Sequence, residues 1–171
     1  LARYRAFALE HASLAKSDYI LYPTKKYLEE GYKRYYETWN AVEVHAPPPI
    51  VTWPTRNTGH EPKDVFLFYG RLFSWKGVDL FVDAAVSFLE RTGSSETKFY
   101  IVGYDSNLPP AGNGTYTDYL LKKIPEEKKS QFSFPGHLSW KQLEELLPRV
   151  RAAVFPSYFE SFCYAAHELY R

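Results

Sequence analysis

Short apolar runs alternate with helical patterns through the second half of the chain. The runs are followed by helical patterns over 78–91, 115–123 and 140–147. Strands that alternate with helices imply right-handed crossovers and a parallel sheet covered on both faces. We therefore predict an α/β class with a Rossmann-like parallel sheet that has helices on both faces. The expected strands are Asp64–Tyr69, Phe99–Val102, Phe132–Pro135 and a last buried strand, Ala152–Phe155, which Pro156 ends.

A proline-rich stretch separates this pattern from the first part of the chain. Pro47, Pro48 and Pro49 are consecutive, and Pro54 and Pro62 follow. Successive prolines favour a semi-rigid extended connector. We therefore predict a linker over 47–62 between an N-terminal segment, 1–46, and an α/β domain, 63–171.

The N-terminal segment contains its own helical and strand-like patterns. We expect an amphipathic helix over Leu1–Lys16, short strands at Tyr19–Tyr22 and Val42–Ala46, and a basic, tyrosine-rich helix to Tyr36 that Thr24 caps. The basic helix has two interpretations, a solvated helix face or an interfacial helix with peripheral membrane contact. Its cationic residues are Lys25, Lys26, Lys33 and Arg34.

Charge and cysteine content exclude several classes of protein. The net charge is +1, so no global field would recruit nucleic acid, and an anion site must be local. The single cysteine, Cys163, excludes an internal disulfide framework and fits a reducing compartment, so we predict a cytoplasmic protein. The chain starts at Leu1 and stops at Arg171 inside a helical pattern, so we also expect an excised piece of a longer protein.

Two loops at predicted strand ends carry groups suited to a phosphate ligand. Gly70 and Arg71 follow the first strand and Lys76 comes five residues later, while Gly136 and His137 follow the third strand. Open parallel sheets bind ligands beyond the carboxyl ends of their strands, and paired cations suit a diphosphate there. The alternatives are ordinary turns with solvated bases and a histidine in a local hydrogen bond.

Two glutamates flank the last helical pattern. Glu160 lies where the loop meets a helix that we expect to begin near Ser161, and Glu168 lies eight residues further along. Unpaired amides at that helix start would favour an anion, above all a diphosphate. The alternative is a loop acid and a solvated helix residue. The chain has no zinc-ligand spacing and no G-x-G-x-x-G, so a dinucleotide cofactor is not expected.

Four motifs in this order resemble a known family. GRLFSWKG, FYIVG, FPGHLSW and AAVFPSYFES, followed by the second glutamate, resemble the nucleotide-sugar half of retaining glycosyltransferases of the two-Rossmann, GT-B type, specifically the group 1 (family four) enzymes. The resemblance covers Asp64 to the end. The first segment is similar to the last helix and strand of the family's acceptor half. The resemblance therefore implies a hexosyltransferase piece that contains mainly the donor domain, and we expect it to be inactive alone.

The resemblance also implies roles for individual residues. Arg71 and Lys76 would neutralise the donor diphosphate, Glu160 would face the donor sugar, and Glu168 would bind the ribose hydroxyls. The Gly136–His137 loop would lie along the base. The donor implied is a UDP- or GDP-sugar, the acceptor is unknown, and no bound metal is implied. The other donor-binding positions that the resemblance implies are Gly70, Ser161 and the backbone amides of Phe162 and Cys163.

This sequence departs from the family at two of these places. Ser161, Phe162 and Cys163 stand where the family often has Gly-Phe-Gly, and Tyr104 begins the turn after Gly103 that the family usually makes glycine-rich. Two alternatives to a transferase therefore stay open. One is a nucleotide-sugar-binding module without catalysis, and the other is a structural or partner-binding α/β domain.

Overall fold

The fold is described from a computed structural model, which defines residues 2–36, 40–49, 64–105 and 114–169. The chain divides into two compact units, one of residues 1–51 with 160–164 and one of residues 52–159 with 165–171. The division after residue 51 falls inside the predicted linker, 47–62, but residues 50–63 lie outside the described part of the chain.

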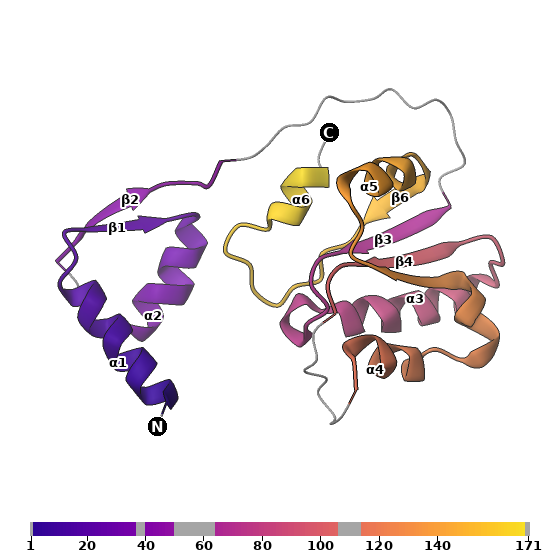
Figure 1. Cartoon of the computed structure of the whole chain (residues 1–171), viewed down its shortest axis with the longest axis horizontal. Helices are drawn as coiled ribbons and strands as arrows, with labels where there is room; N and C mark the ends of the chain where they lie inside the picture. The colour runs from indigo at the N-terminus through magenta and orange to yellow at the C-terminus, as the bar shows by residue number, and fades with distance from the viewer. Residues whose placement is uncertain (1, 37–39, 50–63, 106–113, 170–171) are drawn as a thin grey trace. The chain divides into compact units, whose positions relative to one another are not determined.

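The second unit is built on a four-stranded parallel sheet with the order β5-β4-β3-β6 (Figure 1). In β3 and β4 the register is continuous from Val65 opposite Lys98 to Tyr69 opposite Val102. This order places the carboxyl ends of the strands along one edge of the sheet. The strands are β3 (Val65–Tyr69), β4 (Lys98–Val102), β5 (Phe132–Gly136) and β6 (Val150–Ala153).

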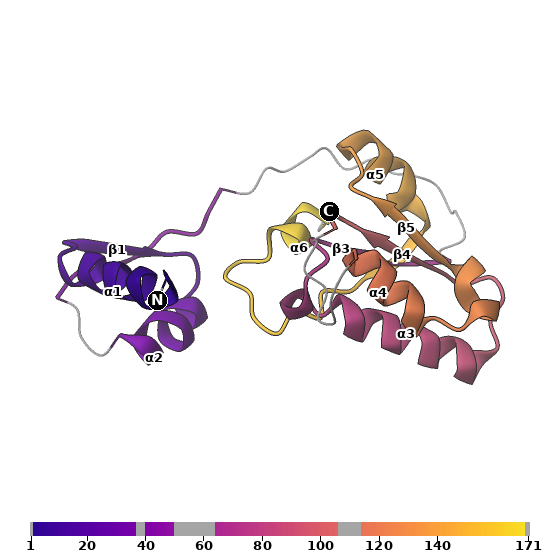
Figure 2. The same cartoon turned by 60° about the horizontal axis from the view of Figure 1, so that its bottom comes forward.

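Helices cover both faces of this sheet (Figures 1 and 2). On one face Phe68 and Phe99 pack with Phe81 and Leu120 of the helices below. On the other face Leu67 packs with residues of the helices above. The Rossmann-like α/β prediction is therefore confirmed. The helices of the lower face are α3 (Val78–Thr92) and α4 (Tyr116–Lys123), those of the upper face are α5 (Trp140–Leu146) and α6 (Tyr164–Leu169), and short 3₁₀ turns cover Ser74–Lys76 (η2), Glu126–Gln131 (η3) and Leu147–Arg149 (η4).

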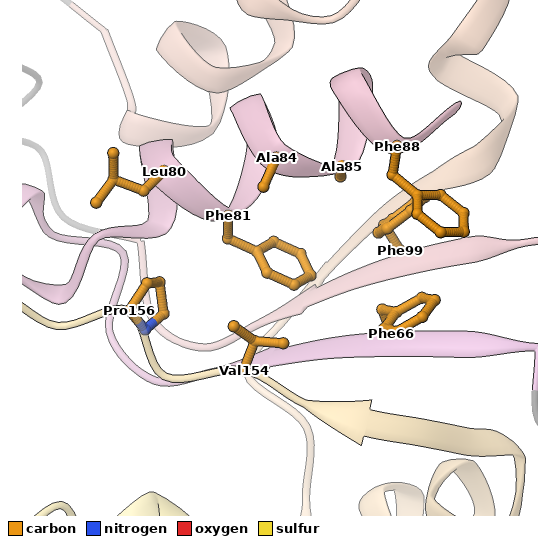
Figure 3. Close-up of a pocket in the computed structure, with 9 residues that line it drawn as sticks. All are labelled: Phe66, Leu80, Phe81, Ala84, Ala85, Phe88, Phe99, Val154 and Pro156. Carbon is orange, nitrogen blue, oxygen red and sulfur yellow. The ribbon is translucent and has the colours of Figure 1, made fainter. Parts of the chain in front are cut away.

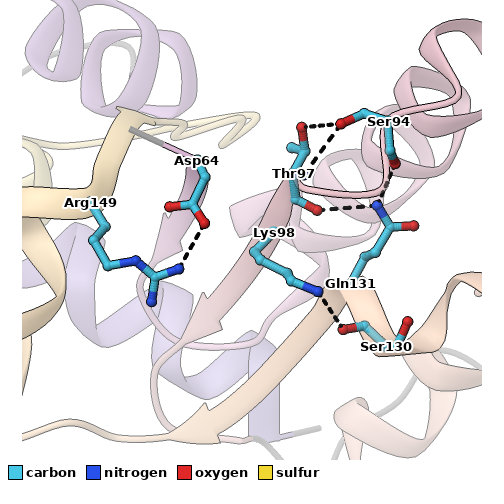
Figure 4. A network of polar contacts seen from close by, with 7 residues as sticks. All are labelled: Asp64, Ser94, Thr97, Lys98, Ser130, Gln131 and Arg149. Carbon is cyan, nitrogen blue, oxygen red and sulfur yellow. Dashed lines mark hydrogen bonds and ion pairs between the residues drawn. The ribbon is translucent and has the colours of Figure 1, made fainter. Parts of the chain in front are cut away.

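Polar side chains close the amino edge of the sheet (Figure 4). Nη2 of Arg149, just before β6, lies 2.7 Å from Oδ2 of Asp64, just before β3. Nε2 of Gln131, just before β5, donates to the carbonyl of Ser94 at 2.7 Å, and Nζ of Lys98 donates to the carbonyl of Ser130 at 3.2 Å. These contacts join the strand starts to one another along the amino edge of the sheet.

Two sequence predictions about the last strand and helix are wrong. β6 runs over Val150–Ala153, two residues earlier than predicted, and Ala152 is exposed rather than buried. Among the described strands β6 pairs only with β3, so one of its sides lacks a neighbour. The helix α6 begins at Tyr164 and not near Ser161, because Cys163 has φ 56°, a left-handed conformation that a right-handed helix does not contain.

The first unit contains two parallel strands, with Tyr19 opposite Val42 and Tyr22 opposite His45. The hydroxyl of Thr24 accepts a hydrogen bond from the amide of Tyr27 at 3.2 Å, which confirms the predicted cap. The predicted basic helix is mostly a wider π turn. The side chains of residues 8–15 in the first helix are exposed except that of Leu14, and the rest of the predicted amphipathic face lies outside the described side chains. The elements are α1 (Ala2–Ala15), β1 (Tyr19–Tyr22), η1 (Tyr27–Tyr32), α2 (Lys33–Tyr35) and β2 (Val42–His45).

Candidate functional site

Three loops lie side by side at the carboxyl ends of β3, β4 and β5. The amide of Gly103 donates to the carbonyl of Gly136 at 2.9 Å, and the amide of Leu72 donates to the carbonyl of Tyr104 at 2.9 Å. Gly103 also lies so close to Gly70 that an added Cβ would overlap the carbonyl oxygen of Gly70. Backbone contacts of this kind leave little freedom, so the three loops form one continuous edge.

The loop after β6 is fixed to the loop after β3. The amide of Tyr158 donates to the carbonyl of Trp75 at 2.9 Å. Gly77 adopts the left-handed conformation, with φ +67°, and a Cβ added there would overlap the carbonyl oxygen of Pro156. Only glycine satisfies both requirements. Lys76 lies between these two contacts, so its backbone position is determined by both loops.

The predicted cations and the predicted histidine lie at neighbouring positions of this edge. Gly70 and Arg71 follow β3, and Lys76 ends the 3₁₀ turn η2 in the same loop. Gly136 ends β5, and His137 follows it. The ends of β3 and β5 are two strand spacings apart, about 10 Å. The Arg71 side chain is exposed. The structure therefore brings these five predicted residues to the loops of one edge of the sheet.

An aromatic stack covers His137. The ring of Tyr104, which follows β4, lies 4.2 Å from the imidazole centroid of His137, and the two planes differ by 10°. Tyr104 is 60% exposed. The sequence prediction treated Tyr104 only as a departure from the expected glycine-rich turn. Its position directly after a strand end, like that of Arg71, was the signal that could have placed it in the site.

Glu168 lies near the last residue of β3. Glu168 is in α6, and its carboxylate is close enough to the phenol of Tyr69 to influence the pKa of that phenol. Burial, followed by the charge and hydrogen bonding of Glu168, raises the pKa of Tyr69 to about 12. Tyr69 therefore stays protonated at any physiological pH and can donate to the carboxylate. Tyr69 was not predicted as a site residue, because its apolar neighbours in the strand mark it as core.

The other acidic candidate belongs to the first unit. Glu160, Ser161, Phe162 and Cys163 form a loop that groups with residues 1–51. The carbonyl of Ser161 accepts a hydrogen bond from the hydroxyl of Thr24 at 3.1 Å. The amides of this loop precede α6 and are not part of its first turn, which corrects the prediction of a helix terminus there. Their role toward a donor stays a prediction.

An apolar groove of about 360 Å³ lies between α3, the strands β3 and β4, and the segment that follows β6 (Figure 3). Its walls come from Leu80, Ala84 and Phe88 on the helix, from Phe66 on β3 and from Val154 just after β6. No predicted site residue lines it, and its lining offers no partner for a phosphate. Within the ranges that the structure defines, no group of three or more His, Cys, Asp or Glu side chains could hold a metal ion. No helix in those ranges is both long and apolar enough to cross a bilayer.

Comparison with known proteins identifies the family. The family model for glycosyl transferases group 1 matches residues 52–169. Glycogen synthase of Mycobacterium tuberculosis is 36% identical over 103 residues, which are 60% of this chain and 22% of that protein. This chain thus spans about a fifth of the length of the curated relatives that it matches.

Solved structures share the fold. WaaG, a glycosyltransferase of lipopolysaccharide biosynthesis, aligns with a TM-score of 0.70 and 21% identity over 97% of this chain and 46% of WaaG. The pneumococcal O-GlcNAc transferase GtfA, solved with UDP and GlcNAc, aligns with a TM-score of 0.63 and 19% identity over 92% of this chain and 29% of GtfA. Sucrose-phosphate synthase from Thermosynechococcus elongatus aligns with a TM-score of 0.61 and 19% identity over 93% of this chain and 40% of the synthase. The chain has the fold of a GT-B glycosyltransferase domain and belongs to the glycosyl transferases group 1 family.

Proposed function

We propose that the carboxyl edge of the sheet binds a nucleoside-diphosphate sugar, the donor from which the protein transfers a sugar with retention of configuration. The observation that carries this proposal is the single edge formed by the hydrogen-bonded loops. The cations lie in the loop after β3, and the two stacked rings, Tyr104 and His137, follow the next two strands, β4 and β5. A nucleoside diphosphate has the same sequence of groups, with the charge at one end and the planar base at the other.

Arg71 and Lys76 bind the diphosphate in this proposal. Arg71 presents a guanidinium, which can contact two phosphate oxygens at once, and Lys76 supplies a second positive charge from the same loop. Negative charge grows on the diphosphate as the sugar leaves, so these cations stabilise the transition state more than the bound donor. They are therefore catalytic residues here.

The two glutamates bind the sugar groups of the donor. Glu168, oriented by Tyr69, accepts hydrogen bonds from the ribose hydroxyls. Glu160 accepts from hydroxyls of the transferred sugar near its reacting face, and Ser161 with the amides of Phe162 and Cys163 contacts phosphate or sugar oxygens. A carboxylate can accept from two hydroxyls at once, which favours this use of each glutamate.

The transfer step replaces one bond at the anomeric carbon by another. The bond to the diphosphate oxygen breaks, and its electron pair leaves with the nucleoside diphosphate. An acceptor hydroxyl forms the new bond on the same face and gives up its proton to a phosphate oxygen that has just been released. Retention follows because the bond forms on the side from which the diphosphate leaves.

This chain supplies mainly the donor-binding part of the transferase. The first unit corresponds to the end of the acceptor-side domain, and groups that hold the acceptor and complete the transfer lie outside the chain. The proposed donor is a UDP- or GDP-sugar, and UDP is the nucleotide in the GtfA structure. We expect this chain to bind the donor and to transfer no sugar by itself.

Calorimetric titration tests the donor site. The chain is titrated with UDP, GDP and ADP, each alone and as a common sugar conjugate, beside Arg71→Ala and Glu168→Gln. Binding of a nucleoside diphosphate that weakens about tenfold or more in each variant supports the proposal, since a charged hydrogen bond contributes about 1.5–3 kcal/mol.

Matched controls come from the far end of α3. Arg91→Ala removes a guanidinium that is also exposed, and Glu90→Gln removes a carboxylate, both at the amino edge of the sheet. Neither control changes the affinity if the site is at the carboxyl edge. A loss of binding in the controls equal to that in the site variants contradicts the proposal.

The second candidate is a nucleotide-sugar-binding module without catalysis. Cys163 favours it, because this side chain stands in a left-handed backbone conformation where the family often has glycine. A β-carbon and a thiol there reduce the space for a sugar. A full-length protein that binds the donor tightly, yet neither transfers nor hydrolyses it, identifies the module, and recovery of transfer in Cys163→Gly identifies the cause.

A further inference from the structure

We propose that the outward face of Tyr104 is a stacking platform for the nucleobase of the donor. This inference rests on the proposed function and adds to it a side chain that binds the base. The expectation from the family resemblance is only that the Gly136–His137 loop lies along the base. Tyr104 stands where a glycine-rich turn was expected, so the platform is a property of this chain.

The backbone of Tyr104 is held on both sides. Its carbonyl accepts from the amide of Leu72 at 2.9 Å, and the amide of the preceding Gly103 is bonded to β5. The carboxylate of the following Asp105 accepts from the amides of Tyr116 and Thr117 at 2.8 and 3.1 Å, at the start of α4. These contacts fix the backbone from which the Tyr104 ring projects.

The ring itself is supported from one side and open on the other. The imidazole of His137 backs the ring at 4.2 Å with planes 10° apart, while Tyr104 stays 60% exposed. A supported ring loses little conformational entropy when a ligand stacks on it. An exposed tyrosine at a ligand-binding edge, held flat by a second ring, is therefore suited to a planar partner.

The position of Tyr104 fits a base rather than a sugar. β4 lies between β3, whose loop carries Arg71, and β5, whose loop carries His137, and adjacent strands are about 4.8 Å apart. A diphosphate at Arg71 thus leaves the ribose and base to extend toward Tyr104. Stacking contributes with any base because every base has a π-face, and the larger face of a purine gains more.

The test separates the base from the diphosphate. UDP, GDP, ADP and inorganic pyrophosphate are titrated against the chain and against Tyr104→Ala and Tyr104→Phe. We expect Tyr104→Ala to weaken the nucleotides on the order of tenfold, with a larger loss for GDP and ADP than for UDP, and to leave pyrophosphate unchanged. Tyr104→Phe keeps the stacking face and retains the affinity. Arg71→Ala weakens nucleotides and pyrophosphate alike.

A control and three results decide the outcome. Tyr35→Ala removes a tyrosine of similar exposure, 63%, from the first unit and should change no affinity. Unchanged nucleotide binding in Tyr104→Ala, with Arg71→Ala still weakened, overturns the platform and leaves the donor site intact. Equal losses for nucleotides and pyrophosphate in Tyr104→Ala also overturn it, because they indicate a distorted loop. No binding of any nucleotide by the wild-type chain overturns both proposals.

Discussion

Gly77 lies against Pro156 so closely that a β-carbon on Gly77 would overlap the carbonyl oxygen of Pro156. This contact joins the loop after β3 to the loop after β6. Lys76 precedes Gly77 directly, so the contact that holds the two loops together also determines where one of the proposed phosphate-binding cations stands.

The first prediction concerns the cost of a side chain at this contact. Gly77→Ala should lower the free energy of unfolding by about 3 kcal/mol or more, because it adds the strain of a left-handed alanine to an overlap that forces the loops apart. Gly93→Ala is the matched variant, since Gly93 has φ +64° and no atom within 4 Å of the added Cβ.

Urea unfolding of both variants measures the difference. Gly93→Ala should lose only about 1–2 kcal/mol, the conformational cost alone. Equal losses in the two variants would show that the contact between the loops contributes nothing to stability.

The second prediction concerns a buried hydroxyl. Tyr116 is completely buried, and its hydroxyl has no hydrogen-bond partner among the described residues. Tyr116→Phe removes an unsatisfied polar atom without creating a cavity, so we expect stability to rise by up to about 1 kcal/mol at neutral pH. A loss of more than about 1 kcal/mol in thermal or urea unfolding would mean that the hydroxyl has a partner.

The pKa of Tyr116 also predicts a loss of stability at alkaline pH. Burial, followed by the charge of Asp79, raises the pKa of Tyr116 to about 12. A pKa raised in the folded state contributes stability that is present below the unfolded pKa, about 10, and is lost as the pH rises toward 12. The stability of the wild-type chain should fall over this range, and that of Tyr116→Phe should fall less. Parallel pH curves for the two proteins would contradict this.

The third prediction concerns the ion pair at the amino edge. The hydrogen bond from Arg149 lowers the pKa of Asp64. A lowered pKa contributes stability above the unfolded value, about 3.9, and this stability is lost as the pH falls through the lower folded value. Asp64→Asn should therefore cost about 1 kcal/mol at pH 7, since the pair is partly exposed, and progressively less as the pH falls through the lowered folded pKa.

Glu127→Gln is the control for the ion pair. Glu127 pairs with Lys128 at 3.3 Å, but its side chain is 71% exposed. Removal of the Glu127 charge should lower the free energy of unfolding less than removal of the Asp64 charge does. A difference between Asp64→Asn and wild type that persists unchanged at pH 2 would exclude the charge as the cause.

The fourth prediction concerns the contact between Tyr69 and Glu168. If Glu168 binds the ribose hydroxyls, the wild-type chain binds a nucleoside diphosphate more tightly than its 2′-deoxy analogue. Tyr69→Phe leaves the carboxylate unoriented, so we expect the preference for the ribose to shrink while thermal stability changes little. Glu168→Gln should shrink it further. An unchanged preference in both variants would remove Glu168 from the ribose site.

The order of strands and helices was predictable because hydrophobic period and length determine it. The strands at Val65–Tyr69 and Lys98–Val102, and the loops with Arg71 and His137 at their carboxyl edge, follow from this pattern alone. The last strand was misplaced because Ala152–Phe155 reads as a buried run, whereas the pairing with β3 begins two residues earlier.

The contacts that orient the site could not be predicted from the sequence. Stacking of Tyr104 on His137 and the proximity of Tyr69 to Glu168 bring together residues that lie far apart in the chain. They depend on register and loop geometry. The late start of α6 depends on one backbone angle, that of Cys163, which residue type alone does not reveal because few cysteines adopt a positive φ.

The most direct test of the donor site is an amide NMR titration of the chain with the nucleoside diphosphate that calorimetry selects. We predict that the amides of Gly70, Gly103 and Gly136 shift, because all three belong to the proposed binding edge. The amide chemical shifts of Ala84 and Phe88, beside the apolar groove, should not change. Shifts confined to the groove, or saturation of binding with the three glycine amides unmoved, would contradict a donor site at the carboxyl edge.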